Sequence, residues 1–128
     1  QAKVDEIKRQ EFLAELEKQA KEEAQRRIDR QKADVIMQQL VHRCAIEAEA
    51  GRNHAILMSL HQGRDYVLPQ YDYGAPTPGS LVHVARFVYD DIQAANAVAD
   101  ADDRLTVKFE YWHDGVGQDC GYNLVVAW

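Results

Sequence analysis

The sequence opens with its longest stretch free of helix breakers. Between Lys3 and Ala50 there is no proline and no glycine, and Gly51 closes the stretch. Because these two residues are the strongest helix breakers, the stretch predicts one helix. A helix of about 49 residues would be about 73 Å long at 1.5 Å per residue. No domain built from the rest of the 128 residues is that wide, so part of the helix must project or pair with another molecule.

The first part of this helix is highly charged. Residues 1–32 hold nine basic and eight acidic side chains. Several acids precede a base by four positions, among them Glu17 with Lys21 and Glu23 with Arg27, and each such pair stabilises a helix by about 0.2–0.5 kcal/mol. The alanines here recur in steps of four without a clean heptad, which argues against a long two-stranded coiled coil. We therefore predict a projecting helical arm over residues 1–32.

The second part of the helix has a different pattern. From Ala33 onward, apolar residues recur at intervals of three and four, as on the buried side of an amphipathic helix. Gly51 then supplies a stop, because glycine adopts the left-handed conformation at a helix end at little cost. We expect this part to lie in the core of a compact domain over residues 33–128. The apolar positions are Ala33, Ile36, Met37, Leu40, Val41, Cys44, Ala45 and Ala48.

The rest of the chain alternates between strand and helix patterns. His54–His61 is apolar at most positions, which predicts a strand that is central or covered on both faces. A second apolar stripe at helical spacing spans residues 81–98. Residues 105–112 alternate between apolar and polar, and across a glycine-rich turn residues 122–128 predict the second strand of a hairpin. The order predicts an α+β fold, with helices near 33–50 and 81–98 on one face of a three-stranded, mainly antiparallel sheet.

The sequence contains no arrangement typical of a catalytic or metal site. Its five histidines and two cysteines do not have zinc-site spacing, and phosphate-binding and dinucleotide-binding motifs are absent. His113, Asp114, Asp119 and Cys120 gather near one hairpin turn and could bind a metal, but polar residues are common in such turns. We therefore predict no catalytic residue, no metal site and no cofactor. A small enzyme of unknown class is the third-ranked hypothesis.

Charge divides the chain into two parts. Residues 1–32 carry a net charge of +1 and the remainder a net charge of −7. An acidic body argues against direct binding of nucleic acid, which requires a basic surface. The acids do permit a second hypothesis, an acidic inhibitor that occupies a basic site on a host protein. Its candidate residues are Asp90, Asp91, Asp100, Asp102 and Asp103.

Two groups of residues are candidates for binding a protein partner. On the arm, Phe12, Leu13 and Leu16 are large and apolar among many charges. Exposed clusters of this kind favour contact with another chain, or with the chain's own domain, over an arm that is only a spacer.

The second group lies in or just before a segment rich in tyrosine and proline, residues 66–80. Tyrosine and arginine dominate the energetics of many interfaces, and proline stiffens the backbone that carries them. The alternative is that one or two of the tyrosines cover the edge of the sheet. The residues are Arg64, Tyr66, Tyr71 and Tyr73.

Two stretches, roughly residues 40–61 and 120–128, have a layout marked by Ile46, Ala50, Gly51, Tyr122 and Trp128. A helix ends at a glycine stop, a strand follows, then a second helix and a hairpin ending in an apolar strand and tryptophan. This layout resembles small phage-encoded proteins. The resemblance implies a phage origin and a role in the virion or in host takeover, and it identifies no site residue.

We therefore expect a non-enzymatic protein-binding or assembly component of a phage particle. Its partner would be a protein, including further copies of the chain joined through the N-terminal helix. No apolar run approaches the ~20 residues of a membrane span and no signal peptide is visible, so we expect the host cytoplasm or the virion as its location. Two cysteines are too few for a disulfide framework.

Overall fold

The computed structural model describes residues 2–63, 65, 81–115 and 119–128. A long helix comes first, and a strand, a second helix, a short 3₁₀ turn and two strands follow. The elements are α1 (Ala2–Glu49), β1 (His54–His61), α2 (Leu81–Val98), η2 (Ala101–Asp103), β2 (Thr106–His113) and β3 (Cys120–Ala127).

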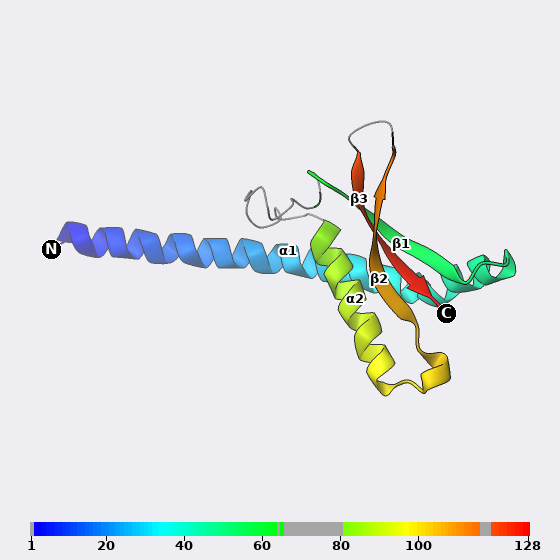
Figure 1. The fold of residues 1–128 in the computed structure, drawn as a ribbon. Helices are drawn as coiled ribbons and strands as arrows, with labels where there is room; N and C mark the ends of the chain where they lie inside the picture. The colour runs from blue at the N-terminus through cyan, green and yellow to red at the C-terminus, as the bar shows by residue number, and fades with distance from the viewer. Residues whose placement is uncertain (1, 64, 66–80, 116–118) are drawn as a thin grey trace.

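The predicted α+β fold is confirmed. The three strands form one antiparallel sheet in the order β1-β3-β2. Both helices pack on the sheet and share one core with it, while the N-terminal part of α1 extends far from the rest of the chain (Figure 1). Each predicted strand agrees with the structure to within two residues, and so does the helix predicted at residues 81–98.

The helix α1 is continuous through the predicted boundary at residue 33. All side chains from residues 2–24 are exposed, and Asp29 is the first buried one. In the second half, Ala33 and Leu40 are buried, with Ile36, Met37 and Cys44 packed beside them. Burial raises the pKa of the Cys44 thiol.

The buried side of α1 is narrower than its apolar pattern indicated. Val41 is 79% exposed, and Ala45 and Ala48 are exposed as well. These three predictions were wrong because α2 and β1 cover only one side of the helix.

The prediction that β1 is central or covered on both faces was also wrong, because β1 is an edge strand and β3 lies in the centre. A β-bulge explains the misleading pattern. The pairing steps from Ile56 to Met58, so that Leu57 has no partner on β3. Before the bulge, the odd-numbered residues of β1 face the core. The extra residue reverses this alternation, so that Leu60 rather than Ser59 faces the core. Arg43 of α1 donates to the Leu57 carbonyl oxygen at 2.9 Å and so stabilises the bulge.

The helix α2 is buried along its first three turns, at Val84, Ala85, Val88 and Ile92. The predicted stripe continues to the end of the helix, but Val98 is 89% exposed. The sheet does not extend under this last turn (Figure 1), which explains the difference.

The central strand begins close to both of its neighbours. Gly121 pairs with His61 on one side and with Trp112 on the other. A Cβ atom at this position would overlap the Leu60 carbonyl oxygen and touch the Trp112 ring. The His61 and Trp112 rings, 4.9 Å apart between centroids and nearly perpendicular, lie on either side of the glycine. Only glycine therefore fits between these strands.

We predict that Gly121→Ala lowers the free energy of unfolding by about 2–3 kcal/mol, because the new Cβ forces two paired strands apart. The control is Gly51→Ala. Gly51 has φ +83° and open space around it, so this change should cost only the backbone strain of about 1 kcal/mol. Urea unfolding of both variants measures the difference. Equal losses would show that β1 and β3 do not approach this closely.

Candidate partner-binding surface on the N-terminal helix

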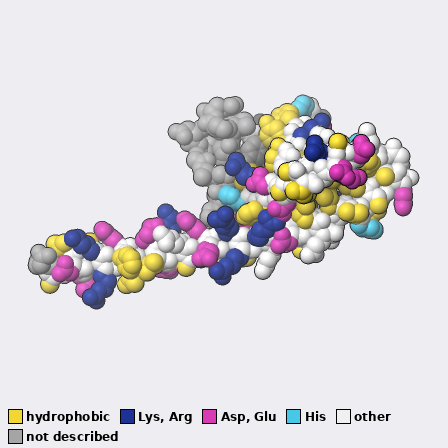
Figure 2. Space-filling view, turned by 90° about the horizontal axis from the view of Figure 1, so that it is seen from below, with side chains coloured by type: hydrophobic (Ala, Val, Ile, Leu, Met, Phe, Trp, Pro, Cys, Tyr) yellow, Lys and Arg dark blue, Asp and Glu magenta, His cyan; other side chains and the backbone are white. Residues whose placement is uncertain are grey.

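The three apolar residues predicted on the arm lie on one side of α1 and are open to solvent. We call Phe12, Leu13 and Leu16 the arm cluster. Their exposed fractions are 63%, 55% and 45%. Because positions three and four apart are neighbours on a helix, the three side chains form one patch, and Figure 2 shows apolar side chains gathered on the projecting part of α1. They do not fold back onto the described part of the domain, which leaves contact with another chain as the predicted way to bury them.

The apolar surface continues along the helix on the side away from the core. Leu13, Val35 and Ile46 all remain about half exposed. They are separated by 22 and 11 positions, and 11 residues make close to three turns, so they lie on one side of α1. The sequence interpretation missed Val35 and Ile46 as surface residues. Their distances from Leu13, 22 and 33 positions and so multiples of 11, were the signal that could have found them.

The charged residues of the arm pair within the helix. Lys21 lies 3.2 Å from Glu17, and Arg27 lies 2.9 Å from Glu23. Both predicted pairs are confirmed, and their side chains are largely exposed. Such exposed pairs stabilise the helix only slightly. They add a little to the stability of the helical arm and leave its apolar residues uncovered.

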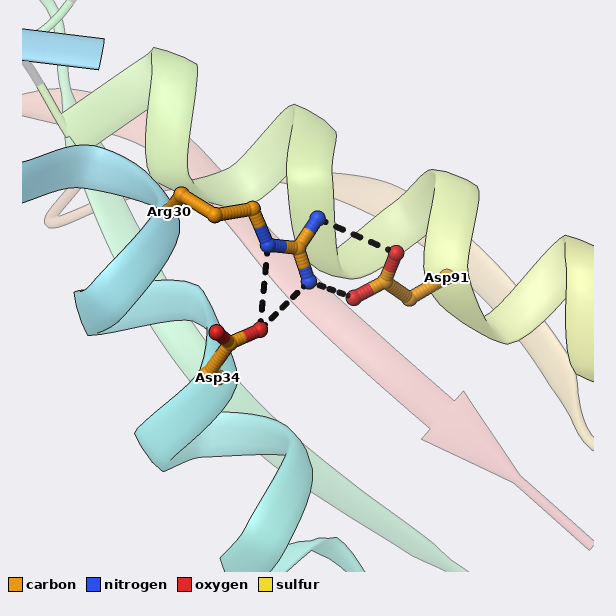
Figure 3. A network of polar contacts seen from close by, with 3 residues as sticks. All are labelled: Arg30, Asp34 and Asp91. Carbon is orange, nitrogen blue, oxygen red and sulfur yellow. Dashed lines mark hydrogen bonds and ion pairs between the residues drawn. The ribbon is translucent and has the colours of Figure 1, made fainter. Parts of the chain in front are cut away.

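One arginine fixes the arm to the body. Arg30 donates from Nη1 and Nη2 to the carboxylate of Asp91 on α2, at 3.2 Å for the Nη1 bond (Figure 3). It also donates to Asp34 from Nε at 3.0 Å and from Nη2 at 2.6 Å. Its guanidinium carbon lies 5.0 Å from the centre of the Phe87 ring. The hydrogen bonds to Asp91 and then Asp34 raise the pKa of Arg30. The bonds to Asp91 join the two helices where they cross.

A cleft of about 650 Å³ lies where the arm meets α2. Its walls carry both signs of charge, among them Arg26, Arg86, Glu22 and Asp90. The buried carboxylate of Asp29 also lines it and accepts a hydrogen bond from Gln25 at 3.1 Å. This mixture selects no single kind of charged ligand.

The acidic residues proposed for an inhibitor do not form one surface. Asp91 accepts a hydrogen bond from Arg30 and is therefore already paired within the chain. Asp102 and Asp103 lie in η2, beyond the opposite end of α2 from the arm. The acids are therefore divided between two places and one of them is already paired.

The hairpin residues considered for a metal site interact with their neighbours. His113 Nδ1 accepts a hydrogen bond from the Gly115 amide at 2.9 Å. Cys120 donates from Sγ to Gln62 Oε1. Hydrogen bonding to Cys120 raises the pKa of Tyr111. Within the described ranges, no three His, Cys, Asp or Glu side chains gather as metal ligands would.

The other predicted binding residues, Arg64, Tyr66, Tyr71 and Tyr73, lie outside the described residues. Comparison with known protein families, curated protein sequences and solved structures gives no match for this chain. In the part of the chain that the structure describes, no helix has the apolar length that crossing a membrane requires.

We predict that Asp91→Asn costs about 1 kcal/mol of unfolding free energy, because Arg30 then loses the charged partner that joins the two helices. The matched control is Asp34→Asn, which weakens a bond of the same arginine within one helix and should cost about 0.3–0.5 kcal/mol. Thermal and urea unfolding of the full chain measure both. If Asp34→Asn proves the more costly, Arg30 does not hold the arm to α2.

Proposed function

We propose that this protein is a non-enzymatic protein-binding or assembly component and that its N-terminal helix is the binding element. The observation that carries the proposal is the arm itself. Residues 2–24 are helical and exposed throughout, a length of about 35 Å at 1.5 Å per residue. The arm cluster lies in the middle of this segment.

The arm is helical before it meets a partner, and this favours binding. Forming the first turn of an isolated helix is unfavourable, because several residues are fixed for a single hydrogen bond. Here the packed second half of α1 supplies that first turn, and the arm extends it. A partner therefore gains the apolar surface without the entropic cost of folding the helix.

Burial of the arm cluster is the energetic reason for assembly. Full burial of a large apolar side chain contributes about 1.5–3 kcal/mol. Three such side chains on one patch supply enough free energy to offset part of the entropic cost of association. The partner is a protein, and a further copy of this chain meets the requirement. The resemblance to small phage-encoded proteins makes a virion the proposed setting.

The acidic-inhibitor hypothesis has less support. It needs the aspartates near residues 90–103 to act together on a basic partner. Asp91 is bonded to Arg30, and Asp102 lies in η2, beyond the C-terminal end of α2. No observation favours this function over assembly.

We predict that replacing Phe12, Leu13 and Leu16 together with serine weakens association at least tenfold, because a loss of only 1.4 kcal/mol is tenfold in affinity. The body should stay folded, since none of the three is buried in it. Sedimentation velocity over a range of concentrations measures self-association, and co-purification from the native host measures binding of other proteins.

Two controls separate contact from helix propensity. Alanine at the same three positions keeps the helix but removes most of the apolar surface. The alanine variant should therefore lose association to the same extent as the serine variant. Serine at Val41 and Val98, which are exposed away from the arm, should leave association unchanged. A parent chain that stays monomeric and recovers no partner, or a triple variant that associates like the parent, would reduce the arm to a spacer.

A further inference from the structure

Along the outer edge of β2, backbone groups have no partner among the described residues. In antiparallel strands, successive residues direct their N–H and C=O groups alternately toward one neighbour and the other. The Asp114 amide donates to the Asp119 carbonyl, which places residue 114, and by alternation residues 112, 110 and 108, in hydrogen-bonded pairs with β3. The residues between them therefore direct their backbone groups away from the sheet. These are Val107, Phe109 and Tyr111.

The start of this edge supports that assignment. Leu105 is two residues before Val107, so its backbone groups also point outward. Asn96 of α2 bonds to both of them, donating to the Leu105 carbonyl at 2.6 Å and accepting from the Leu105 amide at 3.0 Å. Among the described residues, no equivalent partner reaches the outward groups of Val107, Phe109 or Tyr111.

We propose that this edge pairs with the same edge of a second copy of the chain. The two β2 strands run antiparallel about a two-fold axis at Phe109 and join two sheets into one of six strands. Phe109 then exchanges two hydrogen bonds with Phe109 of the second copy. Val107 and Tyr111 of one copy do the same with Tyr111 and Val107 of the other, which gives six new backbone bonds.

The charges on β2 select this register. Lys108 and Glu110 lie on the sheet face opposite the core, 2.9 Å apart within the chain. Pairing about Phe109 sets Lys108 of each copy directly across from Glu110 of the other. These are the positions without mutual backbone bonds, where side chains are closest. A shift by two residues in either direction would instead oppose Lys108 to Lys108 or Glu110 to Glu110, and like charges in that position are destabilising.

The core-side residues of β2 also suit this pairing. Phe109 is 37% exposed and Tyr111 57% exposed, although Phe109 already stacks on Tyr89 of α2 at 5.6 Å between ring centroids. The proposed register sets Phe109 against Phe109 and Val107 against Tyr111. Aromatic pairs and aromatic pairs with β-branched residues are among those that stabilise neighbouring strands. A lone edge lysine would discourage pairing with another strand, but Glu110 makes the edge complementary to itself.

Disulfide trapping in the full chain tests the register. Lys108→Cys and Glu110→Cys variants, each made separately, are mixed under mild oxidation. In the proposed dimer their Cα atoms lie about 4.5 Å apart, within disulfide range. Each variant alone places its new cysteines at diagonal positions about 7–8 Å apart, too far for a bond.

We expect the mixture to give several-fold more cross-linked dimer than either variant alone, with the bond mapped to positions 108 and 110 by mass spectrometry. The parent chain under the same oxidation corrects for Cys44 and Cys120. A mixture that yields no more of this bond than the single variants overturns the proposal, and so does a preference for self-linked Lys108→Cys.

Charge reversal supplies a second test that needs no new cysteine. Lys108→Glu alone and Glu110→Lys alone should each weaken self-association about tenfold, because both cross-copy pairs become like-charged. An equal mixture of the two variants should restore self-association. In the mixed dimer, one copy has acids at positions 108 and 110 and the other has bases at both, so each cross-copy pair is again oppositely charged. The pair within each chain stays broken in both variants, so recovery can come only from contact between chains. Failure of the mixture to recover association, as expected if the edge binds a different protein, overturns the proposal. Both tests are made in the chain that carries serine at Phe12, Leu13 and Leu16, so that the arm cluster does not contribute to the association they measure.

Discussion

The packing of the second half of α1 against α2 and β1 is the contact on which the rest of the structure depends. It places Ala33 and Leu40 in the core and brings Arg30 to Asp91. Because the helix is unbroken, the same contact fixes where the exposed first half points. About half of this 48-residue helix therefore packs in the domain, and the other half is exposed to solvent. The packed half stabilises the arm as a helix, and the arm places its apolar residues away from the domain.

The sheet shows how a small domain depends on this helix. Arg43 satisfies the carbonyl of the bulge at Leu57, and that bulge turns Leu60 into the core. The central strand β3 can then bury both of its faces, with Leu124 and Val126 toward the helices and Val125 on the other side. Its flanking strands remain edges of the sheet among the described residues. The exposed arm and the free edge of β2 are therefore separate surfaces, and their use by two neighbours would let copies join into larger assemblies.

Short-range patterns in the sequence predicted most of the fold. The absence of helix breakers predicted α1, alternation predicted β2, and the positions of Phe12, Leu13 and Leu16 predicted an exposed apolar patch. Contacts between distant residues could not be read in this way. The partner of Asp91 is Arg30, 61 positions away, and the apolar run of β1 concealed both its bulge and its place at the edge of the sheet. The open edge of β2 follows from strand order and so was also beyond sequence reasoning.

The central claim is that the arm is a binding element, and hydrogen–deuterium exchange of its amides in the full chain tests this most directly. An exposed helix held only by its own hydrogen bonds exchanges through local opening, which burial by a partner suppresses. Exchange is compared between dilute protein and protein that is concentrated or bound to a partner from the native host. The account predicts that residues 5–24 become protected on assembly while the core of the body is unchanged. Equal exchange of these amides in both states would contradict it.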